Sequence, residues 1–127
     1  MKSINILLSI GNIEDKNSLL PFIEVASENK DITFYATENT YKFLKENNID
    51  ATLIYKISQQ GKYPNISSYL SEKKFDYIIN IPSRDVSEKH SDYTDGEIIR
   101  RTAAEYGLIA ITDLDVAEII LGNLGSQ

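Results

Sequence analysis

The stretch Ile4-Asn5-Ile6-Leu7-Leu8-Ser9-Ile10, close to the start of the chain, decides the fold class. It is an almost continuous apolar run, which is typical of a strand buried on both faces of a parallel sheet. Residues 14–29 follow with apolar side chains at helical spacing and an acidic first turn, which predicts a helix. Pro21 lies inside this segment and predicts a later helix start or a kink, because proline lacks the backbone donor.

Strand-like and helix-like segments continue to alternate along the chain. Residues 82–94 have almost no apolar anchors and are expected to form the longest loop, Gly107 is expected to cap a helix, and residues 122–127 are expected to fray. Five strands alternating with helices predict one α/β domain over residues 1–127, with right-handed βαβ units and a parallel sheet covered on both faces. The further strands are expected at 32–36, 50–57, 75–81 and 108–112, and the further helices at 38–47, 66–71, 95–106 and 113–121.

Composition narrows the possible functions. The 127 residues include no cysteine, which excludes disulfides, thiolate metal sites and a cysteine nucleophile, and fits a reducing compartment. No apolar run approaches the roughly 20 residues of a membrane span, and Lys2 leads directly into a strand-like segment, so we expect a cytoplasmic protein. The net charge of -6 argues against nucleic acid as a partner, because phosphate backbones require a broad basic face.

Polar side chains follow three of the apolar runs. Thr37 and Thr40 come after the second run, Lys56 belongs to the end of the third, and Asn80 lies at the end of the fourth. The ends of parallel strands meet at one edge of the sheet, so hydroxyl, ammonium and amide groups would converge there and bind a small anion. Each residue also has a plainer interpretation: Thr37 as a helix cap, Lys56 as a solvated lysine and Asn80 as a turn residue. Their joint placement favours the anion site.

Two arginines follow the expected start of the helix at 95–106. Asp95 and Gly96 would open this helix, and Arg100 and Arg101 come one turn later. The plain interpretation is a capped helix with one solvated arginine and one ion pair.

Several short strings, in order, resemble the methylglyoxal-synthase-like domain that closes the large subunit of carbamoyl phosphate synthetase, where it binds allosteric effectors. The resemblance implies a three-layer αβα sandwich with a five-stranded parallel sheet of strand order 3-2-1-4-5. It also implies an effector pocket at the carboxyl edge of the sheet and no catalytic residue, metal or cofactor. The strings are Leu7-Leu8-Ser9-Ile10, Glu14-Asp15-Lys16, Tyr35-Ala36-Thr37 with Thr40, Tyr55-Lys56-Ile57, Pro64-Asn65-Ile66, Tyr77-Ile78-Ile79-Asn80, Asp95-Gly96 with Ile99-Arg100-Arg101, and Thr112-Asp113.

The same resemblance implies which residues bind the effector. In bacterial members the ligand is a nucleoside monophosphate such as UMP or IMP, and in vertebrate relatives it is N-acetylglutamate, so the fold leaves the ligand open. The segment around Lys16 is offset by about one residue from the bacterial pattern. The residues carried over are Ser9, Lys16, Thr37, Thr40 and Lys56 around the phosphate, and Asn80 and Ser83 on the ribose or another polar group.

Two other classes of function remain open. Methylglyoxal synthase shares the fold and eliminates phosphate from dihydroxyacetone phosphate, which requires a carboxylate base. Tyr63 stands where that base is expected, Pro82-Ser83 replaces the synthase's Asp-Pro, and His90 is offset by about two positions. These departures favour a noncatalytic domain over a lyase.

The second alternative is an oligomerisation module, since tyrosine is enriched at interfaces and the chain has eight. The expected partners are therefore a small anionic metabolite, a carbamoyl phosphate synthetase core and further copies of the chain.

Overall fold

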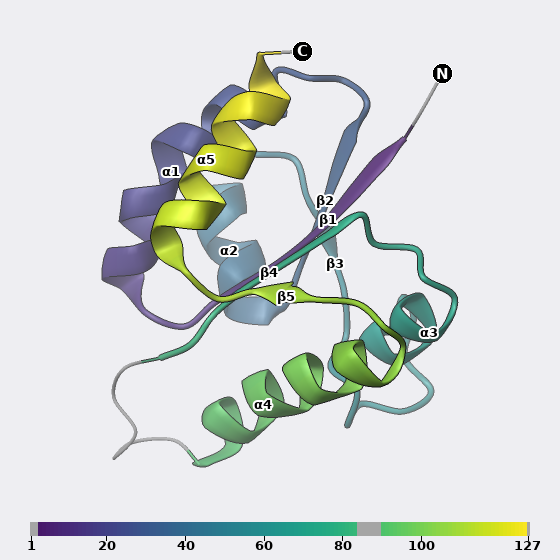
Figure 1. Cartoon of the computed structure of the whole chain (residues 1–127). Coiled ribbons are helices and arrows are strands. Elements are labelled where there is room, and N and C mark those ends of the chain that lie inside the picture. The colour runs from purple at the N-terminus through teal and green to yellow at the C-terminus, as the bar shows by residue number, and fades with distance from the viewer. Residues whose placement is uncertain (1–2, 84–89, 127) are drawn as a thin grey trace.

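A parallel sheet of order β3-β2-β1-β4-β5 forms the centre of the molecule (Figure 1). The computed structural model describes residues 3–83 and 90–126, with only the backbone of residues 90–95. The observed strand order confirms the predicted fold class. The strands are β1 (Ile4–Ile10), β2 (Ile32–Ala36), β3 (Thr52–Leu53), β4 (Tyr77–Ile81) and β5 (Ala110–Ile111).

Helices cover both faces of this sheet (Figure 1). One layer contains α1, α2 and α5, and the other contains α3 and α4, so the architecture is the three-layer sandwich expected from the sequence. None of the described helices is long and apolar enough to cross a membrane. The helices are α1 (Ile13–Ser27), α2 (Glu38–Glu46), α3 (Ile66–Ser71), α4 (His90–Glu105) and α5 (Leu114–Gly125).

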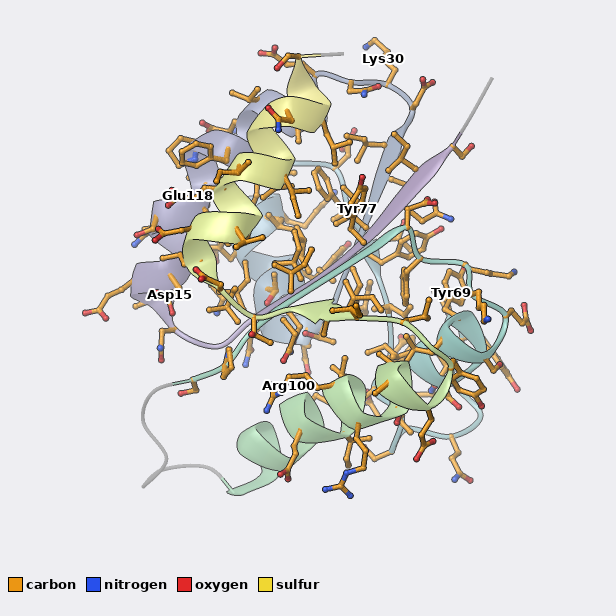
Figure 2. All side chains as sticks on the ribbon, in the orientation of Figure 1. Asp15, Lys30, Tyr69, Tyr77, Arg100 and Glu118 are labelled. Carbon is orange, nitrogen blue, oxygen red and sulfur yellow. The ribbon has the colours of Figure 1, made fainter. Side chains whose placement is uncertain are left out.

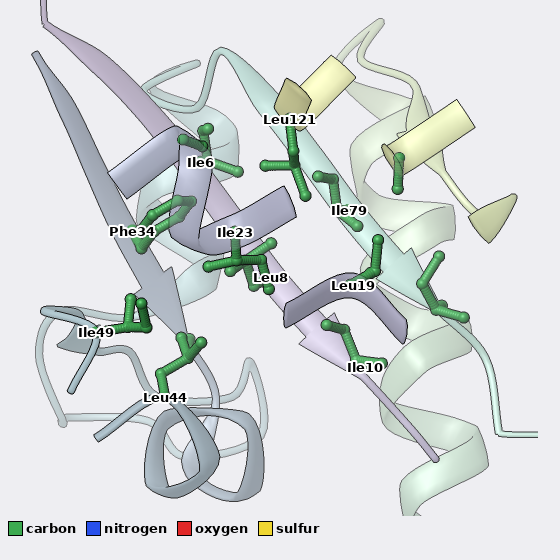
Figure 3. Packing of buried hydrophobic residues seen from close by; sticks show 14 of the residues in the cluster. Ile6, Leu8, Ile10, Leu19, Ile23, Phe34, Leu44, Ile49, Ile79 and Leu121 are labelled. Carbon is green, nitrogen blue, oxygen red and sulfur yellow. The ribbon is translucent and has the colours of Figure 1, made fainter. Parts of the chain in front are cut away.

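Side chains of β1 alternate between two apolar cores. Ile6 and Leu8 point into the core beneath α1, α2 and α5, which Figure 3 shows, whereas Leu7 points into the core beneath α3 and α4. All three side chains are fully buried, at 0% exposure. Burial of each contributes about 1.5–3 kcal/mol, which explains why the first apolar run forms the central strand.

Several elements differ from the sequence-based expectation at their ends, among them β3, α4 and α1. β3 pairs with β2 only over Thr52–Leu53, because β2 ends at Ala36 and the chain beyond Ile54 turns to pair with another segment, through the bridge between Tyr55 and Asn65. α4 begins at His90, within the segment expected to be a loop; residues 84–89 of that segment lie outside the described part. α1 begins at Ile13 and contains Pro21, so the later start was wrong.

Residues 122–127 were expected to fray, but residues 122–125 belong to α5; Gln127 lies outside the described part. α5 continues to Gly125, and Leu124 is only 5% exposed in the core. The Asn29 side chain donates a hydrogen bond to the Leu124 carbonyl oxygen at 3.0 Å, which fixes the last turn. Gly107, by contrast, has the positive φ of 75° expected of a helix-capping glycine.

Candidate effector site

Polar residues form a row across the carboxyl edge of the sheet. Ser9 of β1 is the register partner of Asn80 of β4. The preceding residues pair as Leu8 with Ala36 and Ile79 with Ile111, so the next residues along β2 and β5, Thr37 and Thr112, continue the same row. Side chains alternate along a strand, so all four belong to the face that α3 and α4 cover.

Asn80 is the buried member of this row, and α4 reaches it. Its side chain is only 2% exposed, and its Oδ1 accepts a hydrogen bond from Nη1 of Arg100. Gly96, one turn earlier on α4, lies over the pair: a Cβ there would be 3.3 Å from Arg100 Nη1 and 3.6 Å from Asn80 Oδ1. Figure 2 shows Arg100 extending from α4 toward the strand ends. The expectation of one solvated arginine and one ion pair was therefore wrong for Arg100, while Arg101 pairs with Glu97 at 4.0 Å.

Thr37 and Thr40 lie at the start of α2 and have different roles. Thr37 is the N-cap residue of α2, as the plain interpretation predicts, but its side chain makes no cap hydrogen bond. Thr40 is 2% exposed, and its hydroxyl oxygen accepts a hydrogen bond from Ile10 N at 3.1 Å. Thr40 thus fixes the end of β1 against α2, and its hydroxyl is already in use.

The loop that carries Lys56 is held by Asn65. The Asn65 side chain donates to the carbonyl oxygens of Lys56, at 2.8 Å, and Gln59, at 3.0 Å, and accepts from Ser67 N at the start of α3. The backbone N–H of Lys56 donates in turn to Gln59 Oε1 at 2.9 Å. Residues 56–65 therefore form a closed loop, which places Lys56 beyond the end of β3.

The turns after β1 and β4 pack against each other and adjoin the first turn of α1. The Ser83 hydroxyl donates to Asn12 Oδ1 at 3.2 Å, and Asn12 Nδ2 donates to Asp15 Oδ2 at 3.4 Å. Asp15 and Lys16 are both buried, at 3% and 8% exposure. Ser83 and Lys16, which belong to different strand ends in the sequence, are thus brought to the same corner of the molecule.

An aromatic cluster supports the row from below on the same face. Tyr35 contacts Tyr69 and Phe75, with ring centroids 5.1 Å and 5.8 Å away. Burial, together with a hydrogen bond to Tyr69, raises the pKa of Tyr35 to about 12. Tyr35 therefore stays protonated at neutral pH and acts as scaffold.

Four contributors to this edge were not among the predicted site residues: Asn12, Asn65, Arg100 and Thr112. Thr112 could have been found by extending the strand register to β5. Asn12 and Arg100 act through contacts with distant segments, whereas Asn65 acts by closing its own loop. Tyr63, at the expected position of a lyase base, is 76% exposed.

A family model described as the MGS-like domain matches residues 18–112. The chain belongs to the MGS-like domain family. It is 39% identical over 101 residues to the carbamoyl phosphate synthase large chain of Archaeoglobus fulgidus, a match that covers 80% of the chain and 9% of that relative. It is 30% identical over 122 residues to the multifunctional protein pyr-3 of Neurospora crassa, covering 92% of the chain and 7% of the relative.

One further relative agrees with this assignment, and one solved structure shares the fold. The mitochondrial carbamoyl-phosphate synthase (ammonia) of Homo sapiens is 32% identical over 103 residues, covering 77% of the chain and 7% of the relative. The MGS-like chain thus spans less than a tenth of the length of these curated relatives. The crystal structure of ForH has a TM-score of 0.61 at 15% identity, covering 98% of the chain and 84% of ForH, which shows a shared fold.

Proposed function

We propose that this MGS-like chain is a noncatalytic regulatory domain that binds a nucleoside monophosphate, such as UMP or IMP, for a carbamoyl phosphate synthetase. The observation that carries the proposal is the row of Thr37, Ser9 and Asn80 at the carboxyl edge. One end of this row is the start of α2, and the Lys56 loop follows β3, the strand beside β2. The similarity to carbamoyl phosphate synthases, among them large chains, supports the choice of partner.

The phosphate would bind at the start of α2. The first N–H groups of a helix have no partner within it, and the aligned peptide dipoles favour negative charge there. Thr37 makes no cap bond there, so its hydroxyl is available to the phosphate. Lys56 and Lys16 would supply positive charge, while Thr40 would act indirectly by fixing β1 against α2.

Asn80 and Ser83 would bind the ribose or another polar group beyond the phosphate. Asn80 lies beside Ser9, which would contact the phosphate, and Ser83 continues from β4 into the turn packed on Asn12. The amide of Asn80 and the hydroxyl of Ser83 suit a ribose hydroxyl or a carbonyl oxygen. Regulation then requires the ligand to bind two states of the synthetase with unequal affinity, since equal affinity shifts no population.

Calorimetric titration tests the ligand class. We expect UMP or IMP to bind more tightly than inorganic phosphate, with N-acetylglutamate and ornithine as comparison ligands. If neither nucleotide binds at millimolar concentration, the proposal is wrong. Sedimentation of the unliganded chain tests the oligomerisation alternative, because a chain that self-associates strongly but binds none of these ligands would favour that role.

A matched pair of lysine variants tests the position of the phosphate. Lys56→Ala should weaken nucleotide binding by about 1.5–3 kcal/mol, the usual contribution of a charge-assisted hydrogen bond. Lys62→Ala removes the same charge from the same loop, but Lys62 lies over the Tyr55 ring at 5.6 Å and should have little effect. Equal losses in both variants would indicate a nonspecific charge effect and argue against the site.

The lyase alternative is tested directly with dihydroxyacetone phosphate. A noncatalytic domain should release no methylglyoxal above the uncatalysed rate. Turnover that Tyr63→Phe leaves unchanged but Lys56→Ala abolishes would identify the chain as an enzyme with its base elsewhere.

A further inference from the structure

Arg100 reaches the candidate site and has no carboxylate partner among the side chains that the structure describes. It is partly buried, and its one recorded side-chain bond among the described residues goes to the neutral amide of Asn80. Arg101, its neighbour on α4, pairs with Glu97 and is 70% exposed. A guanidinium has five N–H donors, so one bond to Asn80 leaves most of the donor capacity of Arg100 unused.

The bond to Arg100 also fixes the orientation of the Asn80 amide. Guanidinium groups only donate, so the Asn80 atom facing Arg100 is its oxygen, and Nδ2 remains as a donor. No hydrogen bond from Nδ2 is recorded in the described part of the chain, and no buried polar side-chain atom there lacks a partner. Asn80 Nδ2 is therefore within reach of solvent, although the residue as a whole is 2% exposed.

The sheet sets the distance between this pair and the start of α2. Thr37 and Asn80 lie in one row with Ser9 between them, which makes two strand spacings. Adjacent strands are about 4.8 Å apart, so the two ends of the row are about 10 Å apart. An inorganic phosphate bound at Thr37 cannot span that distance, whereas a larger phosphorylated molecule can.

We infer that Arg100 and Asn80 form a second recognition group, which binds an oxygen acceptor about 10 Å from the phosphate of the effector. The inference rests on the proposed function and deepens it: the ligand carries a phosphate at one end and a carbonyl or anionic oxygen at the other. The Arg100 guanidinium and the Asn80 Nδ2 donate to that oxygen. Gly96 leaves room for α4 to lie close above them.

Binding of UMP and of inorganic phosphate to three proteins tests the inference: the wild-type chain, Arg100→Gln and Arg101→Gln. The Arg100→Gln variant keeps an amide donor for Asn80 but loses the charge and the fork of donors. We expect it to weaken UMP binding at least tenfold and to change phosphate binding less than twofold. Arg101→Gln removes the same charge one position away and should change neither.

The possible outcomes separate this inference from the proposed function. UMP binding that falls equally in both variants, or by less than twofold in Arg100→Gln, would overturn the inference and leave the proposed function intact. A parallel loss of UMP and phosphate binding in Arg100→Gln would also overturn it, because it would show that Arg100 merely supports the edge. If neither UMP nor IMP binds the wild-type chain, both the proposed function and the inference fail.

Discussion

Gly11 lies directly against the backbone of Ser83, so that a Cβ at residue 11 would be 2.7 Å from the Ser83 nitrogen. The Gly11 N–H also donates to the Ile81 carbonyl oxygen at 2.9 Å. The turn after β1 and the turn after β4 are therefore joined by main-chain contact, in addition to the hydrogen bond from Ser83 to Asn12.

Gly11→Ala should destabilise the protein by about 1–3 kcal/mol, the usual cost of forcing extra atoms into a packed region. Gly122→Ala is the matched control, since its Cβ would meet only Phe22 Cδ1 at 3.7 Å. Alanine is the better helix former, so this control should stabilise α5 by about 0.5–1 kcal/mol. Urea unfolding measures the change in the free energy of unfolding for both variants. If Gly11→Ala leaves that free energy unchanged, the two turns can separate at little cost.

Asn65→Ala should lower the free energy of unfolding by about 2–3 kcal/mol, because it removes a helix cap and two hydrogen bonds to loop carbonyl groups. It should also weaken nucleotide binding by freeing the Lys56 loop. Asn65→Asp keeps the acceptor for Ser67 N but loses both donors, so it separates the cap from the loop contacts. Denaturation and calorimetry on the same samples measure the two effects, and nucleotide binding equal to wild type in both variants would contradict the role in positioning Lys56.

Thr40→Val should destabilise the chain by about 1–3 kcal/mol, because Ile10 N would lose its hydrogen-bond acceptor in the core. Thr40→Ser keeps the hydroxyl and should retain most of the stability. If Thr40 acts only by fixing β1, the Ser variant binds UMP like wild type. A large loss of UMP affinity in a fully stable Ser variant would instead indicate that the ligand contacts Thr40 itself.

Stability should fall as the pH rises from about 10 to 12, in part because of Tyr35. Burial and the hydrogen bond to Tyr69 raise its pKa to about 12 in the folded state, whereas an unfolded tyrosine titrates near 10. The stabilisation that the protonated Tyr35 gives to the folded state is thus complete below pH 10 and is lost as the pH rises through 12. Tyr35→Phe should show a smaller fall in unfolding free energy between pH 9 and 11, and an identical fall would mean that Tyr35 ionises normally.

The buried strands could be predicted from the sequence because strands covered on both faces appear as apolar runs, whereas their order was implied by the family resemblance. The bounds of β1, β2 and α3 match the expectation residue for residue. The first turns of α4 could not be predicted, because residues 90–94 include serine, aspartate and threonine, which favour caps and turns in isolation. The last turn of α5 depends on the buried Leu124 and on Asn29, a partner from another part of the chain.

For the candidate site, the edge at which its residues meet could be predicted from the sequence, but the contacts that orient them could not. Parallel topology is enough to bring Thr37, Ser9 and Asn80 to one edge, and the register confirms that Ser9 and Asn80 are partners. The contacts that orient the site depend on helix phase and loop closure: Arg100 rather than Arg101 turns toward Asn80, and Asn65 closes the Lys56 loop. The sequence does not contain that information in any local pattern.

The row at the carboxyl edge lies between helices of opposite layers. α2, which begins after Thr37, packs with α1 and α5 on one side of the sheet, whereas Arg100 belongs to α4 on the other side (Figure 1). A molecule held by both ends of the row would cross-link the two layers over the tips of the strands. A bound ligand would then restrain the motion of one helical layer relative to the other. The effect of binding could therefore reach both layers without any rearrangement of the sheet.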